Sequence, residues 1–278
     1  MELWFTENHS KNVKFSIRVK DVLFKTKSPY QHIAVYETED FGRVLALDDV
    51  VQVTTKDEFI YHEMITHIPL FTHDKPKRVL IIGGGDGGSV REVLKHPINE
   101  VHHVEIDEQV LKTSKKFFPT ISCGYDDSRT KIFFEDGIQF VKNNKGYDVI
   151  IIDSTDPLGP AVGLFSKDFY EDVFEALNDD GIMVAQTESP FYYSNLIKQI
   201  YDDISGLFKF ANIYTAVVPT YPGVYWSFTM GSKKINPLSK DLKDVTEIDT
   251  KYYSKEIHKS CFVLPPFVKE MISTSSKK

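Results

Sequence analysis

The chain has 278 residues, of which 41% are hydrophobic and 26% charged, and its formal net charge is −7. Such a composition is typical of a packed globular protein with one large domain or two unequal ones. The negative charge weighs against nucleic acid as the main partner, and no apolar run approaches the roughly 20 residues of a membrane span. Residues 1–10 have neither a basic start nor an apolar core, and two cysteines are too few for a disulfide framework. We therefore expect a soluble, cytoplasmic protein with no nucleic-acid or membrane partner.

Residues 1–55 are predicted to form a small antiparallel β domain. Apolar and polar side chains alternate from Val13 to Lys20, the period-two pattern of a strand with one buried face. Further strands are expected at Ile33–Glu37 and Val44–Leu47. A helix is predicted to begin near Thr55, because Thr55 and Glu58 have the spacing of a capping box.

Residues 56–278 are predicted to form a larger α/β domain. Apolar strands alternate with amphipathic stretches, which favours a parallel, doubly wound sheet with helices on both faces. Two late strands separated by turn residues are expected to pair antiparallel. The expected strands are Val79–Ile82, Val101–Ile106, Lys131–Phe134, Val149–Ile152, Ile182–Ala185, Ile213–Val218 and Tyr225–Met230, and the expected helices are Ser89–Lys95, Gln109–Phe118 and Asp168–Leu177.

A glycine loop follows the first of these parallel strands. The run Gly83-Gly84-Gly85-Asp86-Gly87-Gly88 satisfies GxGxxG between a strand and a helix, at the sheet edge where open α/β folds bind ligands. No Lys-Ser/Thr pair follows, so the loop is not an ATP-type P-loop. Asp86 would repel a pyrophosphate but attract an amine. A structural turn with a solvated Asp86 is the plain alternative.

Two acids after the next strands suit a nucleoside. Glu105 follows Gly83 at close to the ~20 residues expected for an acid that binds ribose hydroxyls, although Asp107 could be a neighbouring helix cap. Asp136, before Gly137, could accept the exocyclic amine of adenine, cap a helix, or do both.

A fourth feature combines two acids with a stiff, hinged segment. The run Asp153-Ser154-Thr155-Asp156-Pro157-Leu158-Gly159-Pro160 follows a very apolar strand. Its prolines and glycines have the local stiffness and hinge points that lids need, so we expect a lid over residues 154–164. A simple connecting loop is the alternative.

His62 and His67 form no zincin motif. Their spacing is one residue longer than that of HExxH, which rotates the second ring by roughly 140° on a helix. We expect no metal site, and a lone histidine on a helix is more often structural than functional.

Taken together, these features resemble the polyamine aminopropyltransferase family, most closely its bacterial spermidine synthases. The resemblance implies a small β domain joined to a methyltransferase-like Rossmann domain, assembled as a homodimer or homotetramer. It runs nearly end to end and rests on Tyr30-Gln31-His32, residues 57–64, Gly83–Gly88, Glu105-Ile106-Asp107, Asp153–Pro160 and residues 219–222.

The resemblance implies transfer of an aminopropyl group from decarboxylated S-adenosylmethionine to putrescine, giving spermidine and 5′-methylthioadenosine. The donor is a co-substrate, and neither a cofactor nor a metal is implied. Asp153 would be the catalytic base, and Asp86 would bind the aminopropyl amine. By resemblance, the thioadenosine part would contact Gln31, Glu105, Asp136, Gly137 and Pro160, and the diamine would contact Tyr61, His62, Asp86, Asp153, Ser154, Thr155, Asp156 and Tyr221.

Elementary chemistry agrees with these roles. The amines of a diamine have pKa values near ~10, so at neutral pH the nucleophile is protonated and needs a base. The attacked carbon bears a sulfonium, so the leaving group departs as a neutral thioether without acid or metal. Cadaverine, agmatine or spermidine could replace putrescine as acceptor. An S-adenosylmethionine-dependent methyltransferase is a rival, against which Asp86 argues, and a noncatalytic nucleoside-binding protein is another.

Overall fold

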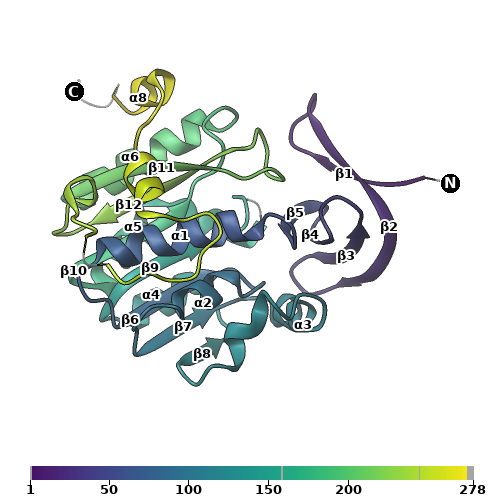
Figure 1. Ribbon diagram of the computed structural model, residues 1–278, viewed down its shortest axis with the longest axis horizontal. Helices are drawn as coiled ribbons and strands as arrows, with labels where there is room; N and C mark the ends of the chain where they lie inside the picture. The colour runs from purple at the N-terminus through teal and green to yellow at the C-terminus, as the bar shows by residue number, and fades with distance from the viewer. Residues whose placement is uncertain (1, 158, 244, 274–278) are drawn as a thin grey trace.

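The computed structural model describes residues 2–157, 159–243 and 245–273, and within them two sheets lie side by side (Figure 1). The smaller sheet is an antiparallel meander in the order β1-β2-β3-β4-β5. Its hairpin between β4 and β5 turns at Asp48 and Asp49, whose φ angles of 46° and 63° suit a tight turn with matching twist. The strands are β1 (Leu3–Asn8), β2 (Lys14–Lys27), β3 (His32–Thr38), β4 (Arg43–Leu47) and β5 (Val50–Thr54).

The larger sheet has the order β11-β12-β10-β9-β6-β7-β8. Strands β10, β9, β6, β7 and β8 are parallel, whereas β12 pairs antiparallel with both β10 and β11. The predicted α/β class and the predicted final antiparallel pair are therefore confirmed. The strands are β6 (Arg78–Gly83), β7 (Glu100–Val104), β8 (Thr130–Phe133), β9 (Tyr147–Asp153), β10 (Leu177–Gln186), β11 (Phe210–Val217) and β12 (Tyr225–Ser232).

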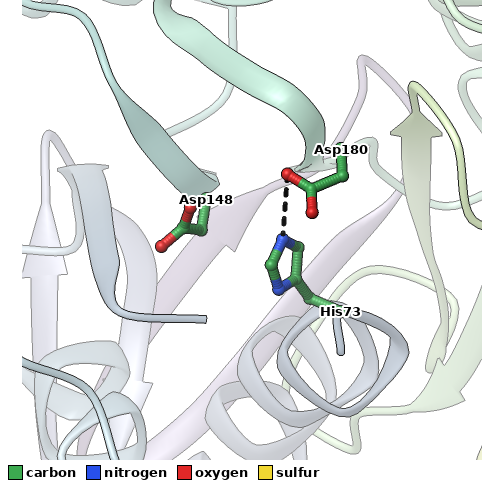
Figure 2. Close-up of side chains that lie close together, drawn as sticks. All are labelled: His73, Asp148 and Asp180. Carbon is green, nitrogen blue, oxygen red and sulfur yellow. Dashed lines mark ion pairs between the residues drawn. The ribbon is translucent and has the colours of Figure 1, made fainter. Parts of the chain in front are cut away.

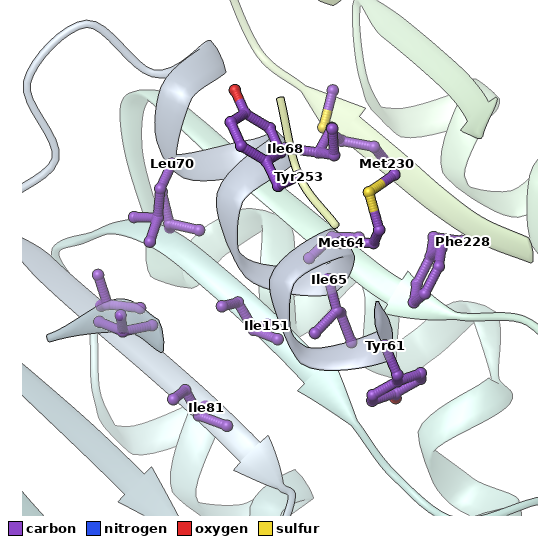
Figure 3. Close-up of a cluster of buried hydrophobic side chains, with 14 of the residues drawn as sticks. Tyr61, Met64, Ile65, Ile68, Leu70, Ile81, Ile151, Phe228, Met230 and Tyr253 are labelled. Carbon is purple, nitrogen blue, oxygen red and sulfur yellow. The ribbon is translucent and has the colours of Figure 1, made fainter. Parts of the chain in front are cut away.

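Helices cover both faces of the large sheet. Alternate residues of β6 show this: Ile81 packs in the core under α1, and Leu80 packs in the core under α5. Figure 3 shows the first core, with Met64 and Ile68 of α1 above the strands. The helices are α1 (Glu58–Thr72), α2 (Gly88–Val93), α3 (Glu108–Phe117), α4 (Gly137–Asn143), α5 (Lys167–Ala176), α6 (Ser194–Leu207), α7 (Lys255–Ser260) and α8 (Pro266–Ser273), with short 3-10 helices η1 (Ser122–Asp126), η2 (Gly159–Phe165) and η3 (Pro237–Ser239).

The predicted capping box at the start of α1 is wrong. The N-cap is Asp57, and its side chain makes no capping bond. The Asp57 carboxylate instead accepts hydrogen bonds from the amide (3.0 Å) and hydroxyl (2.7 Å) of Thr220. The Thr55 hydroxyl accepts from the Arg43 amide (3.1 Å), and Glu58 binds His62 and Arg91. The side chains that the local spacing predicts as caps therefore bond instead to residues outside the first turn of the helix.

None of the helices in the described part of the chain is both long and apolar enough to cross a membrane.

Candidate active site

A cavity lies at the carboxyl edge of the parallel strands, and both sheets form its wall. The predicted site residues that line it are Gln31, Tyr61, Gly83, Gly84, Gly85, Asp86, Glu105, Asp136, Gly137, Asp153, Ser154, Thr155, Asp156 and Tyr221. The small sheet adds residues that sequence reasoning did not assign to the site: Tyr30, Leu45, Leu47, Asp48, Val50 and Gln52. Tyr30 belongs to the motif Tyr30-Gln31-His32 but had no assigned role, and neither a motif nor a spacing marks the other five, because the fold alone brings β4 and β5 to the cavity.

Three predicted residues do not line the cavity, and one is only partly described. Gly87 is the N-cap residue before α2, and a Cβ on it would lie 2.8 Å from the ring of Tyr125. Gly88 and His62 lie against each other below Asp86. Pro160 belongs to η2, but its side chain, like residue 158, lies outside the described residues. Ala161 and Leu164, from the predicted lid, line the cavity, and lid motion stays a prediction.

The glycine loop leaves space for two acids. A Cβ built on Gly84 would lie 2.4 Å from Oδ2 of Asp153, and one built on Gly85 would lie 2.8 Å from Oε2 of Glu105. Gly84 also has a φ of +70°, which disfavours other residues. The glycines therefore place the loop backbone directly beside the two carboxylates.

Asp153 ends β9, and both of its oxygens are held. The Tyr61 hydroxyl donates to Oδ1 and the Ser89 hydroxyl to Oδ2, each at 2.6 Å. The side chain is nearly buried, with 7% of the residue exposed. Burial, and then the charge of Asp86, raise the pKa of Asp153 against the opposing effect of His62 and the two hydroxyls. Such a carboxylate is oriented and more basic than an exposed aspartate. Sequence reasoning missed Ser89, the second residue of α2, which reaches Asp153 because β6, the strand before the glycine loop, pairs with β9.

The two acids after β7 have different partners. Asp107 caps α3 through Gln109 (3.0 Å) and accepts hydrogen bonds from Ser28 (2.6 Å) and Gln31 (3.0 Å) of the small sheet. Glu105 accepts the Asp107 amide at Oε1 (2.9 Å) and faces the cavity. Burial raises the pKa of Glu105 to about 7. Asp107 therefore has a structural role, since it joins α3 to the small-sheet domain, and Glu105 is the acid that can bind a ligand.

Asp136 caps α4 by accepting a hydrogen bond from the Ile138 amide (2.8 Å) and also lines the cavity. One oxygen serves the helix, so the other can serve a ligand. Gly137 follows it at the cavity wall, in contact with Ile82.

A second group of acids lies beyond Asp156. The fully buried Glu188 has a φ of +69°, and among the described residues its carboxylate oxygens receive no hydrogen bond. Its carboxyl faces that of Asp156, and burial followed by this neighbour raises the Glu188 pKa well above its usual value. Glu7 of β1, bonded to the Val51 amide (2.8 Å), also lies near Asp156, and burial raises its pKa to about 7. Three acids from distant parts of the sequence thus meet, and His9 contacts the group through Glu7, with its Nδ1 2.8 Å from Oε1 of Glu7. Among the described residues, no ion pair is formed by Asp156 or Glu188 themselves.

Tyr221 connects the cavity to the small sheet. Its hydroxyl donates to the backbone oxygen of Gln52 in β5 (2.7 Å), and its ring lies 5.5 Å from that of Tyr61. The adjacent Thr220 is the residue that Asp57 binds. The loop before β12 is therefore held by hydrogen bonds to β5 and to the N-cap of α1.

One histidine–acid group brings three possible metal ligands together: His73, Asp148 and Asp180 (Figure 2). It lies at the amino end of β9, away from the cavity. Asp148 already accepts two backbone amides and Asn178, at 2.7–2.9 Å. The Lys75 amide donates to Nδ1 of His73 (3.2 Å), which places the ring proton on Nε2, the atom that faces Asp180 at 3.7 Å. These contacts do not favour a metal.

Known proteins resemble the chain over nearly its full length. Residues 58–244 match the family model for the spermine/spermidine synthase domain, and residues 3–55 match the model for the spermidine synthase tetramerisation domain. A polyamine aminopropyltransferase of Thermoanaerobacter pseudethanolicus is 57% identical over 273 residues, covering 98% of this chain and 99% of the relative. One of Caldicellulosiruptor bescii is 52% identical over 274 residues, with the same coverage.

Solved structures agree with the sequence relatives. A spermidine synthase in complex with the transition-state analogue AdoDATO has a TM-score of 0.95 and 41% identity, covering 98% of this chain and 95% of the other. The spermidine synthase of Thermotoga maritima has a TM-score of 0.94 and 41% identity, covering 98% and 94%.

Proposed function

The chain belongs to the spermine/spermidine synthase family, and on that premise we propose that it transfers the aminopropyl group of decarboxylated S-adenosylmethionine to putrescine. Membership makes it a polyamine aminopropyltransferase. The choice of substrates rests on acids that lie at three points of the cavity. Glu105 is at the first, Asp86 and Asp153 are at the second, and Asp156, with Glu188 behind it, is at the third. These positions suit a nucleoside, a reacting centre rich in positive charge, and a distant second ammonium.

The donor fits the wall between the two sheets. Glu105 accepts hydrogen bonds from the ribose hydroxyls, and Asp136 and Gly137 lie beside the adenine base. Gln31 forms the wall of the nucleoside pocket on the side of the small sheet. Asp86 holds the aminopropyl ammonium. Its Oδ1 already accepts the Gly88 amide (2.7 Å), which leaves Oδ2 for the ligand.

Asp153 accepts the proton that the attacking amine loses. The nitrogen lone pair then forms a bond to the carbon next to the sulfonium, and the carbon–sulfur bond breaks with its electron pair going to sulfur. Tyr61 and Ser89 hold both carboxylate oxygens during this step, and the raised pKa of Asp153 helps it to accept the proton. The products are 5′-methylthioadenosine and a longer polyamine, and the reaction needs neither a metal nor an organic cofactor.

The acids beyond Asp156 favour an acceptor with two ammonium groups. A buried carboxyl such as Glu188 that faces a second acid is costly unless the two share a proton or meet a cation. The far ammonium of putrescine supplies that cation next to Asp156 and Glu188, while the near amine reacts at Asp153.

A product assay tests the proposal. Decarboxylated S-adenosylmethionine with an isotope-labelled aminopropyl group is offered with putrescine, cadaverine, agmatine and spermidine in competition, and the labelled products are separated by mass. We expect spermidine to dominate. Another main product would reassign the acceptor, and methylated products in a parallel assay with S-adenosylmethionine as the donor would favour the methyltransferase alternative.

We also propose a homo-oligomer. The small sheet matches a tetramerisation domain, and its first strand exposes Leu3 (47%) and Trp4 (52%), which an interface between copies would cover.

A further inference from the structure

His103 contacts the backbone of the glycine loop without lining the cavity. It is the fourth residue of β7 and is fully buried, and its Nε2 lies 2.7 Å from the carbonyl oxygen of Gly83. The pairing of β6 with β7 ends at Ile82 and Val104, so Gly83 lies just beyond the last pair. The His103 side chain therefore joins the two strands at the point where their backbones stop pairing.

The two nitrogens of this ring have different surroundings, and these fix where its proton lies. A carbonyl oxygen only accepts hydrogen bonds, so Nε2 of His103 carries the proton. Nδ1 is buried, and among the described residues it has no hydrogen-bond partner. Burial lowers the pKa of His103 to about 4, against the opposing effects of the Gly83 carbonyl and the charge of Asp86. The ring is therefore neutral near pH 7 and offers the loop one fixed donor.

Gly83 in turn packs against the end of β9. Its φ is +83°, and a Cβ built on it would lie 2.3 Å from the backbone oxygen of Asp153. On the other side, Glu105 follows His103 by two residues and lies at the end of β7. One hydrogen bond therefore connects the ends of three neighbouring strands, β7, β6 and β9, and two of these ends carry the acids Glu105 and Asp153.

Tyr125 of η1 packs beside His103 and supports the other half of the loop. The two ring centroids are 5.3 Å apart, and a Cβ on Gly87 would lie 2.8 Å from the tyrosine ring. The Tyr125 hydroxyl donates to the Gly84 carbonyl at 3.3 Å, which is long for a bond between oxygens. The same carbonyl already accepts the Gly87 amide at 2.9 Å. Tyr125 therefore acts mainly through packing, and His103 through its hydrogen bond.

We infer that His103 is a positioning residue for the transfer reaction: its Nε2 proton fixes the Gly83 carbonyl, and the fixed loop keeps Asp153 and Glu105 in place. Loss of this bond would release the first peptide of the loop from β7. A shift of about 1 Å at reacting groups can cost about a hundredfold in rate. The effect on turnover rests on the proposed function, whereas the effect on the loop does not.

Variants of His103 separate the hydrogen bond from the packing. His103→Leu keeps a buried apolar side chain without a donor, whereas His103→Gln carries an amide that can donate to the same carbonyl. We expect His103→Leu to lose about tenfold or more in kcat and to bind 5′-methylthioadenosine about three- to tenfold more weakly. His103→Gln should recover most of both. His103→Asn, one carbon shorter, should resemble His103→Leu and replaces it if that variant does not fold.

His102 offers a matched control, because it is the same residue on the opposite face of β7. It is also buried, and its Nδ1 lies 3.0 Å from the hydroxyl of Tyr147, away from the loop. His102→Leu should lower thermal stability, as His103→Leu does, but should keep kcat and nucleoside affinity. All proteins are compared at a temperature at which their unfolding curves show them to be folded.

Two readouts do not depend on the reaction. The ¹⁵N signals of the wild type should show a proton on Nε2 of His103 and none on Nδ1. Amide hydrogen exchange of residues 83–88 should be faster in His103→Leu than in the wild type or His102→Leu.

A wild-type ring with its proton on Nδ1 would overturn the inference. So would equal kcat and equal loop exchange in His103→Leu and His102→Leu, or a His103→Gln protein as impaired as His103→Leu. If the wild type transferred no aminopropyl group, the proposed function would fail, and the exchange and ring signals would still decide whether His103 holds the loop.

Discussion

Gly84 and Asp153 approach each other so closely that a Cβ on the glycine would lie 2.4 Å from the carboxylate. With a φ of +70°, Gly84→Ala would combine backbone strain with displacement of Asp153. We expect it to lose at least about tenfold in turnover, since misplacement by ~1 Å costs about that or more. Gly206→Ala is the matched control, because a Cβ there meets nothing within 4 Å. That helical substitution should stabilise the protein by about 0.5–1 kcal/mol in thermal or denaturant unfolding and keep turnover. Equal turnover in both variants would contradict the prediction.

Asp153→Asn should keep the fold and the affinity for 5′-methylthioadenosine but lose roughly 10²–10⁴-fold in turnover, the usual cost of losing a general base. The amide keeps the shape of the side chain and cannot accept the proton. Steady-state rates with saturating putrescine measure this. Asp179→Asn, whose side chain is 97% exposed, is the control. Turnover similar in the two variants would remove Asp153 from the role of base.

Glu105 should make nucleoside binding depend on pH. Its pKa of about 7 is raised from about 4.5, and ribose hydroxyls donate to the ionised form. Affinity for 5′-methylthioadenosine is therefore complete above about pH 7 and should weaken, by up to about tenfold per unit, as pH falls below it. Glu105→Gln should bind at least about tenfold more weakly at pH 8 and flatten the profile. Calorimetric titration at several pH values measures both, with the surface variant Glu108→Gln as control. A flat wild-type profile would mean that another group holds the ribose.

Asp86 should select the donor. S-adenosylmethionine carries a carboxylate beside its amine, and like charges ~5 Å apart at an effective dielectric near 20 repel by about 3 kcal/mol. Screening and the adjacent ammonium reduce this penalty, so a large preference for the decarboxylated donor is expected. Asp86→Asn should weaken binding of that donor and narrow its advantage over S-adenosylmethionine. The ratio of the two dissociation constants is the readout, and an unchanged ratio would show that Asp86 is not the selector.

Glu188 should distinguish diamines from monoamines. Glu188→Gln removes one carboxyl opposite Asp156 and should raise the KM for putrescine about tenfold, because a charge-assisted hydrogen bond is lost. Butylamine lacks the second ammonium, so its kinetics should not change. 5′-Methylthioadenosine binding should also stay constant. A variant with the wild-type preference for putrescine over butylamine would place the far ammonium elsewhere.

Local patterns were sufficient to predict the sheet core and the cavity edge. The apolar runs at β6 and β9 predict parallel strands. Acids that directly follow parallel strands lie at the carboxyl edge of the sheet, and this does not depend on the conformation of the loops. The capping box at Thr55 failed because Asp57 and Glu58 bind partners far along the chain. Strands β1 and β5 were not predicted, since neither has a long alternating pattern to mark it.

The acid group around Asp156 could not be predicted in the same way. Glu7 and Glu188 belong to no motif, and only the fold brings them together. A buried carboxylate at a positive φ is a tertiary property, which spacing along the chain does not record. The position of His62 below Asp86, rather than at the cavity wall, depends likewise on Gly88 and on the approach of α2 to α1.

The hydrogen bond from Tyr221 to Gln52 and the bonds from Thr220 to Asp57 join the loop before β12 to the small sheet and to the start of α1. Detachment of the small sheet would therefore free Tyr221, open the nucleoside pocket beside Gln31 and withdraw Glu7 in one event. The two sheets are consequently expected to melt as a single cooperative unit, and a nucleoside bound between them would protect both from unfolding. If the donor is the sulfonium proposed above, a molecule that begins to unfold therefore releases its substrates and stops transferring the group.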